Sequence, residues 1–258
     1  MIFDSHCHLD PNTYGGDAGV DAVVETARAA GVTRMLNVGA GYGDGSAARA
    51  VAVAERHEGI WASVGLHPHD AKLWNPAVRQ ALEALAERPK VVAWGEIGLD
   101  FFYDNSPREQ QRLAFREQIR IARSRALPII IHDRDSEGEA LAILDEEGAF
   151  EGRVLYHCYA GDVLQLDKLV ERGAIVSIPG VVTYKKAVEL HEVVRAVPST
   201  NYLVETDAPF LTPEPLRGRR NEPCHTALTV EAVARLRGST PQVVAQETWE
   251  NASRFFGI

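Results

Sequence analysis

The sequence predicts a single-domain α/β protein with the (β/α)8 barrel fold. Short runs rich in β-branched residues alternate with amphipathic helix patterns, as in a parallel sheet with right-handed crossovers. Eight such units fit within the 258 residues of the chain, close to the ~250 residues typical of this barrel. No linker or low-complexity segment marks a boundary, so one domain is expected over residues 1–258.

The expected strands are short apolar runs bounded by turn residues. In chain order they cover residues 2–8, 34–39, 60–66, 91–97, 128–132, 154–158, 174–178 and 202–207. An open doubly wound sheet is the alternative arrangement, but its phosphate-binding signature is missing. The glycine-rich run from Gly39 to Gly45 gives GxGxxG in no register, so we interpret it as a flexible loop.

The expected helices carry recognisable start signals. Ser106 is predicted as an N-cap, Pro107 as the first helical residue and Glu109 as the capping-box partner. Asp162 is expected to open a later helix in the same way. The apolar face of the helix after Pro107 is expected to consist of Phe115, Ile119, Ala122 and Ala126.

Composition excludes several classes of protein. A net charge of −9 argues against a protein that coats nucleic acid nonspecifically, because phosphate neutralisation needs a positive face. Three cysteines form neither a CxxC motif nor an even set, so they are expected to be reduced. No apolar run approaches the ~18 residues of a membrane helix, and the first residues lack the pattern of a signal peptide. A cytoplasmic protein without membrane contact is expected.

The first strand carries a candidate metal-ligand pair. Side chains alternate along a strand, so His6 and His8 project from one face while Cys7 points the other way. Imidazole nitrogen is a common ligand of zinc and other first-row divalent metals. A hydrogen-bonded histidine pair is an equally good interpretation of this motif alone, so the remaining ligands must come from elsewhere.

Polar residues also fall at the carboxyl ends of later strands, where barrel enzymes place their chemistry. Each alone more often caps a loop or bonds the backbone. Together with the first pair they suit two ions ~3.5–4 Å apart that share one bridging carboxylate. The expected bridge is Glu96, because it stands between the strand-one pair and the later histidines around the barrel. Gly95 and Gly98 beside it would allow backbone and metals to approach closely. The later candidates are Glu96, His132, His157 and Asp207.

These motifs resemble the successive signatures of the TatD family of metal-dependent deoxyribonucleases. They are Asp4-Ser5-His6-Cys7-His8-Leu9-Asp10, Gly65-Leu66-His67-Pro68, Gly95-Glu96-Ile97-Gly98-Leu99-Asp100, His132-Asp133-Arg134, Tyr156-His157-Cys158, Glu205-Thr206-Asp207-Ala208-Pro209 and Arg217-Gly218-Arg219-Arg220-Asn221-Glu222-Pro223. The resemblance implies a TIM barrel, two divalent metal ions and hydrolysis of DNA phosphodiester bonds, often exonucleolytic. It leaves open whether the metals are Mg, Mn, Zn or Co.

Carried over by position, the resemblance makes six residues metal ligands: His6, His8, Glu96, His132, His157 and Asp207. Two departures from the family pattern put substrate preference in doubt. Ala160 replaces the usual serine after the sixth-strand His-Cys, and Arg219 stands where a lysine is common. Neither position is a proposed ligand.

The expected mechanism is hydrolysis by a metal-activated water. Asp207 and Glu96 are the expected catalytic residues, with Asp207 orienting or deprotonating the water. The expected substrate contacts are His67, Arg134, Arg217, Arg219 and Arg220, the arginines through phosphate. A histidine that caps its loop is the alternative for His67, and a solvated loop is the alternative for the arginines. Phe102 and Tyr103 could stack bases, although burial against a helix is an equally good interpretation.

Two other functions remain open at this stage. A small-molecule amidohydrolase or esterase could use the same barrel, but many such enzymes bridge two metals with a strand-four lysine, and this chain has Glu96 there. A metal-dependent binding protein without turnover is the third candidate. The expected partner is DNA or an oligonucleotide bound transiently, and a monomer is the default state.

Overall fold

The computed structural model describes residues 1–41, 43 and 45–258. Its chain divides into two compact units. The first unit comprises residues 1–36 and 157–258, and the second comprises residues 37–156. Two positions of the glycine-rich run, Tyr42 and Asp44, lie outside the described residues, and with them part of the predicted flexible loop.

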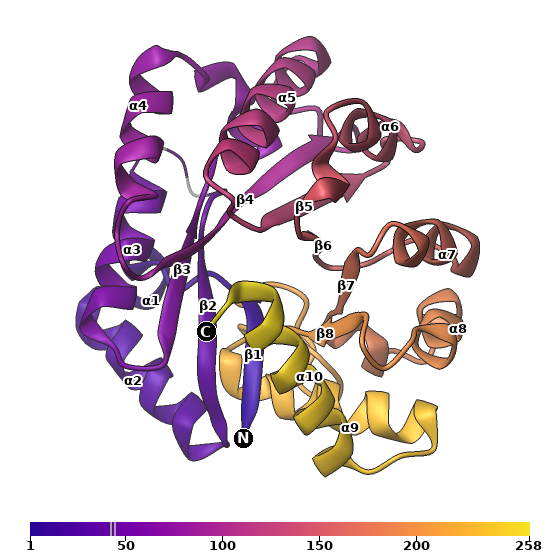
Figure 1. Ribbon diagram of the computed structural model, residues 1–258. Helices are drawn as coiled ribbons and strands as arrows, with labels where there is room; N and C mark the ends of the chain where they lie inside the picture. The colour runs from indigo at the N-terminus through magenta and orange to yellow at the C-terminus, as the bar shows by residue number, and fades with distance from the viewer. Residues whose placement is uncertain (42, 44) are drawn as a thin grey trace. The chain divides into compact units, whose positions relative to one another are not determined.

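The first unit contains both ends of the chain. Its strands are β1 Ile2–Cys7, β2 Val32–Gly39, which continues into the second unit, β7 Ile175–Ile178 and β8 Tyr202–Val204. Its helices are α1 Pro11–Tyr14, α2 Asp17–Ala29, α7 Val163–Glu171, η3 Gly180–Thr183, α8 Val188–Ala196, η4 Pro223–His225, α9 Thr226–Arg237 and α10 Pro241–Phe256. The last helix packs beside the first strand (Figure 1).

The first and last strands of the chain are neighbours within this unit. Cys7 and Ala208 form a parallel bridge, and the His8 amide donates to the Ala208 carbonyl at 2.8 Å. Thr206 donates from its amide and from Oγ1 to the buried Asp4 carboxylate, at 2.9 and 2.6 Å. These contacts hold the ends of β1 and β8 against each other, as a barrel requires of its first and last strands.

The second unit carries the middle strands. Its elements are α3 Ser46–Arg56, β3 Ile60–Val64, η1 Pro68–Leu73, α4 Pro76–Leu85, β4 Val91–Asp100, α5 Arg108–Ser124, β5 Ile129–Arg134, α6 Glu139–Glu146, η2 Ala149–Glu151 and β6 Val154–Tyr156. The pairs β3–β4, β4–β5 and β5–β6 are parallel. In the β4–β5 register, Gly98 faces His132 and Asp100 faces Arg134. This register sets which strand-end side chains meet.

The predicted fold class is confirmed. The eight strands follow their sequence order in one sheet and alternate with helices. All eight expected strands are present, with ends that differ by up to three residues. A single domain over residues 1–258 stays a prediction, because the chain divides into two compact units.

The predicted start of α5 is wrong by one residue. The helix begins at Arg108 with Pro107 as its N-cap. The Ser106 hydroxyl instead donates to the His69 carbonyl at 2.7 Å and accepts the Lys72 amide at 3.1 Å. Ser106 therefore ties the loop after β4 to η1. Ala126, predicted on the apolar face, lies beyond the helix end and is exposed.

Helices α5 and α6 are joined by a ladder of ion pairs. The Glu147 carboxylate accepts from Arg120 Nε at 2.7 Å and from Arg116 Nη1 at 3.1 Å. The hydrogen bond from Arg120, opposed by partial burial, helps to hold the pKa of Glu147 below its usual range. Further pairs are Arg112–Glu139, Arg116–Glu146 and Arg123–Glu151.

Glu147→Gln is expected to lower the free energy of unfolding by about 0.5–1 kcal/mol at neutral pH and low salt. A carboxyl whose folded-state pKa is lowered stabilises the fold above its usual pKa, and this contribution is lost as the pH falls. The deficit should therefore shrink below about pH 4 and in ~1 M salt. Urea unfolding of this variant measures the deficit, with Glu171→Gln, a change at an exposed position, as the control. A deficit that persists at high salt contradicts an ionic origin.

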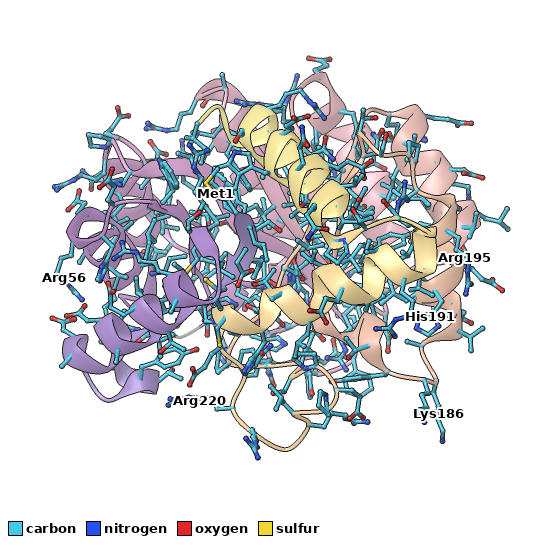
Figure 2. The ribbon with its side chains drawn as sticks, turned by 90° about the horizontal axis from the view of Figure 1, so that it is seen from below. Met1, Arg56, Lys186, His191, Arg195 and Arg220 are labelled. Carbon is cyan, nitrogen blue, oxygen red and sulfur yellow. The ribbon has the colours of Figure 1, made fainter. Side chains whose placement is uncertain are left out.

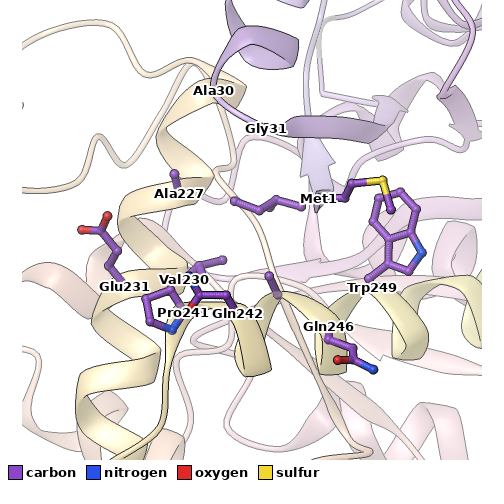
Figure 3. Close-up of a pocket in the computed structure, with 12 residues that line it drawn as sticks. Met1, Ala30, Gly31, Ala227, Val230, Glu231, Pro241, Gln242, Gln246 and Trp249 are labelled. Carbon is purple, nitrogen blue, oxygen red and sulfur yellow. The ribbon is translucent and has the colours of Figure 1, made fainter.

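A cavity of about 430 Å³ lies at the start of β1 (Figure 3). It is lined by Met1, Ile2, Ala30 and Gly31 and by residues of α9 and α10, including Trp249. Glu231 is the one ionisable side chain among the lining residues. Metal or hydrolytic chemistry is therefore not expected here. None of the helices described is both long and apolar enough to cross a lipid bilayer.

Candidate metal centre

In the first unit, the end of β1 brings three predicted ligands together. His6 and His8 lie on one side of the strand, with their Nε2 atoms 3.3 Å apart, while Cys7 Sγ donates to the Leu36 carbonyl. This is the alternation that the sequence predicted. Oδ1 of Asp207 lies 3.5 Å from His8 Nε2 and 3.8 Å from His6 Nε2.

Asp207 reaches the two histidines because its backbone adopts a left-handed conformation just after β8, with φ of 55°. Its amide donates to the His6 carbonyl at 2.9 Å. Burial alone would raise its pKa, but the hydrogen bond from His8 and the neighbouring imidazoles hold the pKa of Asp207 below its usual range. The carboxylate is therefore charged at neutral pH and can bind a cation.

His157 and Glu205 complete this first cluster. The His157 ring stacks on the His6 ring, with centroids 3.9 Å apart. Oε1 of Glu205 lies 3.4 Å from His157 Nδ1 and accepts the Cys158 amide at 2.7 Å. Ligand atoms of His6, His157 and Glu205 lie within 4.8 Å of one another.

Glu205 has one carboxylate oxygen that the described residues leave unsatisfied. The side chain is fully buried, and Oε2 has no hydrogen-bond partner among the described residues. A buried carboxylate oxygen without a partner is costly in a folded protein. Oε2 of Glu205 can therefore bind a positively charged group, such as a divalent cation.

In the second unit, the ends of β3, β4 and β5 form another cluster. His132 Nδ1 lies 2.7 Å from Glu96 Oε1, and His67 Nε2 lies 3.4 Å from the same oxygen. The ligand atoms of these three residues lie within 4.8 Å of one another. Glu96 is 3% exposed, so its carboxylate has little access to water. Two imidazoles and one carboxylate are a donor set that suits a divalent metal.

His67 is a hydrogen-bond donor in this cluster. Burial lowers its pKa to about 4, so its ring is neutral at pH 7. Its Nδ1 accepts the His69 amide at 3.1 Å, which leaves the ring proton on Nε2. An Nε2–H donor matches the predicted substrate contact better than a metal ligand.

Asp100 lies behind His132 at the end of β4 and is fully buried. Its Oδ2 lies 3.0 Å from His132 Nε2 and 2.9 Å from His69 Nε2. Burial would raise the pKa of this carboxyl, but the hydrogen bonds from His132 and His69 outweigh it and hold the pKa well below its usual range. The sequence motif contained Asp100, yet no pattern indicated this contact.

Two strands approach closely where His132 lies. A Cβ atom added to Gly98 would stand 1.9 Å from the His132 carbonyl oxygen, and one added to Gly95 would stand 2.7 Å from Ile130. Both glycines also have positive φ, 148° and 153°. The predicted close approach of backbone at these glycines is confirmed, and it places β5 against β4.

Exposed aromatic side chains border the second cluster. Phe102 and Tyr103 follow β4 and are 56% and 54% exposed. Arg134, at the end of β5, lies over both rings at 4.3 and 4.8 Å. The Tyr103 ring meets His69 edge-on at 5.5 Å. The predicted alternative, burial of both rings against a helix, is wrong.

The predicted arginine loop lies between β8 and α9 in the first unit. Arg217, Arg219 and Arg220 are all exposed, and Figure 2 labels Arg220 on this loop. Arg217 lies over the Tyr184 ring at 4.4 Å, and Arg220 lies over the Tyr14 ring at 4.6 Å. Two of the three guanidinium groups are therefore held in place by aromatic contacts.

The six predicted ligands are divided between the two units, and within each unit they lie together. His6, His8, His157 and Asp207 belong to the first unit, and Glu96 and His132 belong to the second. Their assembly at one rim around a shared Glu96 stays a prediction. Sequence reasoning gave no role to Glu205 or Asp100, although both stand at strand ends within the quoted motifs.

The chain is similar over its full length to proteins of one family. A model of the family described as TatD related DNase matches residues 3–257. The chain is 39% identical to an uncharacterized metal-dependent hydrolase, YabD, of Bacillus subtilis, with 100% of both chains covered. It is 38% identical to the 3'-5' ssDNA/RNA exonuclease TatD of Cronobacter sakazakii, covering 99% of this chain and 97% of that protein. The crystal structure of YJJV, a TatD homologue from Escherichia coli, superposes with a TM-score of 0.91 at 29% identity, covering 100% of this chain and 98% of that one.

Proposed function

The chain belongs to the TatD-related DNase family of metal-dependent hydrolases, and from this we propose that it removes nucleotides from single-stranded nucleic acid. The observation that carries the proposal is the pair of buried histidine and carboxylate clusters at the strand ends. A full-length relative at 38% identity is named as a 3'-5' exonuclease of single-stranded DNA and RNA. Nucleic acid is accordingly the proposed substrate class.

The proposed centre holds two divalent ions. The proposed ligands are His6, His8, Glu96, His132, His157 and Asp207. The distances within each unit support metal binding by each cluster, and the family resemblance supports the full set of six ligands. When bound, the ions would lower the pKa of water and stabilise charge on the reacting phosphate.

The side chains of the protein have separate tasks in the proposed reaction. Asp207 is charged at neutral pH, so its carboxylate can orient a water molecule and accept its proton. The Nε2–H of His67 can donate to a phosphate oxygen, because Nδ1 of that ring is already occupied by the His69 amide. Arg134 and the exposed Arg217, Arg219 and Arg220 can pair with further phosphates.

The decisive test is metal-dependent release of nucleotides. Single-stranded DNA and RNA labelled at the 5' or the 3' end are incubated with protein stripped by EDTA and reloaded with Mg²⁺, Mn²⁺, Zn²⁺ or Co²⁺. Stepwise shortening from the 3' end, lost after stripping and restored by a metal, is expected. Metal binding without shortening of any strand would overturn the nuclease proposal.

An esterase or amidohydrolase function is the second candidate. It is tested in the same metal series with a panel of carboxylic esters and dipeptides. The proposal expects turnover of these compounds to be far below turnover of oligonucleotides. Preferential hydrolysis of an ester or dipeptide would favour the second candidate instead.

Phe102→Ala and Tyr103→Ala are each expected to raise KM for single-stranded DNA about tenfold, because a base–aromatic stack contributes ~1–3 kcal/mol. The exposed positions of both rings beside Arg134 support this contact. Leu113→Ala is the matched control, since Leu113 is a similarly exposed apolar residue on α5. An oligonucleotide with an abasic 3' end should be cleaved equally by all forms. Equal losses on normal and abasic DNA would contradict base stacking.

A further inference from the structure

Asp100 uses both carboxylate oxygens in different ways. Oδ1 accepts the backbone amides of Phe102 and Tyr103 at 3.2 and 2.9 Å. Oδ2 faces the Nε2 atoms of His69 and His132, at 2.9 and 3.0 Å. The two amides prevent rotation of the carboxylate, because turning it would break the bonds at Oδ1. The orientation of Oδ2 toward the rings is therefore set by the backbone.

This orientation offers an acceptor to Nε2 of the His132 ring. An ionised carboxylate is an acceptor only, so a neutral His132 ring that bonds to Oδ2 must carry its hydrogen on Nε2. Its Nδ1 then bears the lone pair. That atom lies 2.7 Å from Glu96 Oε1, on the side of the proposed metal ligands. Without a metal, Glu96 competes with Asp100 for the ring proton, and a cation bound at Nδ1 would take the place of a proton there. A metal can bind Nδ1 only when it is unprotonated.

We propose that Asp100 is the positioning residue that sets the His132 tautomer, so that Nδ1 faces the metal. This inference rests on the proposed metal centre and extends it to a residue outside the six ligands. Carboxylates that hold metal-ligating imidazoles in this way raise metal affinity, and their loss typically weakens binding about 10–100-fold. A merely structural Asp100 would order the loop after β4 without changing the His132 ring.

Asp100→Asn separates these two roles. The amide oxygen of the replacement can still accept from Phe102 and Tyr103, so the loop keeps its hydrogen bonds. The amide NH2 then takes the place of Oδ2 and donates, which forces His132 Nε2 to accept. The ring proton moves to Nδ1, where it blocks metal binding. Asp133→Asn is the matched control, because Asp133 is the neighbouring carboxylate on β5 and bonds Ser136 instead of His132.

The first measurement is the tautomer itself, in metal-free protein with 15N-labelled histidine at a pH where the rings are neutral. It is made in a Glu96→Gln background, which removes the competing carboxylate at Nδ1. Two-bond 1H–15N spectra, with the His132 ring assigned through His132→Gln, should show a proton on Nε2. Adding Asp100→Asn should move it to Nδ1, and adding Asp133→Asn should not. An unchanged His132 tautomer in the Asp100→Asn protein would overturn the proposal.

The second measurement is zinc affinity by calorimetry in the otherwise native protein. Asp100→Asn should weaken one zinc-binding event about 10–100-fold, while Asp133→Asn should bind as the native protein does. Native-like zinc binding by Asp100→Asn would also overturn the proposal. If the native protein binds no divalent ion, the proposed function fails, and the tautomer spectra still decide the role of Asp100.

Discussion

Glu96→Gln is expected to lower kcat for oligonucleotide hydrolysis by a factor on the order of 10³ or more, about 4 kcal/mol of transition-state stabilisation. The Glu96 carboxylate is almost fully buried and lies 2.7 Å from His132 Nδ1 and 3.4 Å from His67 Nε2. The replacement keeps the size of the side chain but removes its charge. His132 is then left without the carboxylate ligand of its cluster, so divalent metal should bind weakly.

Steady-state kinetics and metal stoichiometry measure this effect together. Far-UV circular dichroism should remain native, since the replacement is isosteric. Glu109→Gln is the control, because Glu109 lies in the same unit, is 87% exposed and pairs with Arg112 on the surface of α5. Near-native turnover by the Glu96 variant would refute its assignment as a ligand and catalytic residue.

Gly98→Ala is expected to destabilise the protein by more than about 4 kcal/mol, a range that marks severe steric conflict. Its Cβ would stand 1.9 Å from the His132 carbonyl oxygen and 2.9 Å from the carbonyl carbon. Backbone atoms in a paired strand cannot move aside as a flexible side chain can. Strand β5 must shift, and His132 must leave its position beside Glu96.

Gly138→Ala is a matched control for this variant. Gly138 also has a positive φ, 87°, but an added Cβ would meet nothing within 4 Å. The free energy of unfolding of that variant should fall by only ~1 kcal/mol, the usual cost of a left-handed conformation for a residue with a Cβ atom. Chemical unfolding of both variants isolates the contribution of the close contact. Similar losses of unfolding free energy in the two variants would show that glycine is needed at position 98 for its backbone conformation and not for the close approach of β5.

The fold class and the candidate ligands could be predicted because both depend on local pattern. Apolar runs with alternating helix patterns specify βα units, and a polar residue at the end of an apolar strand is visible without coordinates. The start of α5 differs from the prediction because local pattern does not report distant partners. Ser106 has the composition of an N-cap, but its hydroxyl bonds His69 and Lys72 more than thirty residues away, and local pattern cannot report such partners.

By itself, the sequence determined the order of strands and helices, the alternation that turns His6 and His8 to one side, and the types of residue at the strand ends. Only the tertiary structure decided that Asp100 Oδ2 meets His132, that Gly98 admits the β5 backbone, and that a Glu205 oxygen is buried without a partner among the described residues. The physical reason is register. Side chains distant in the chain meet according to how strands align, and one residue of slip would turn each of them to the opposite face.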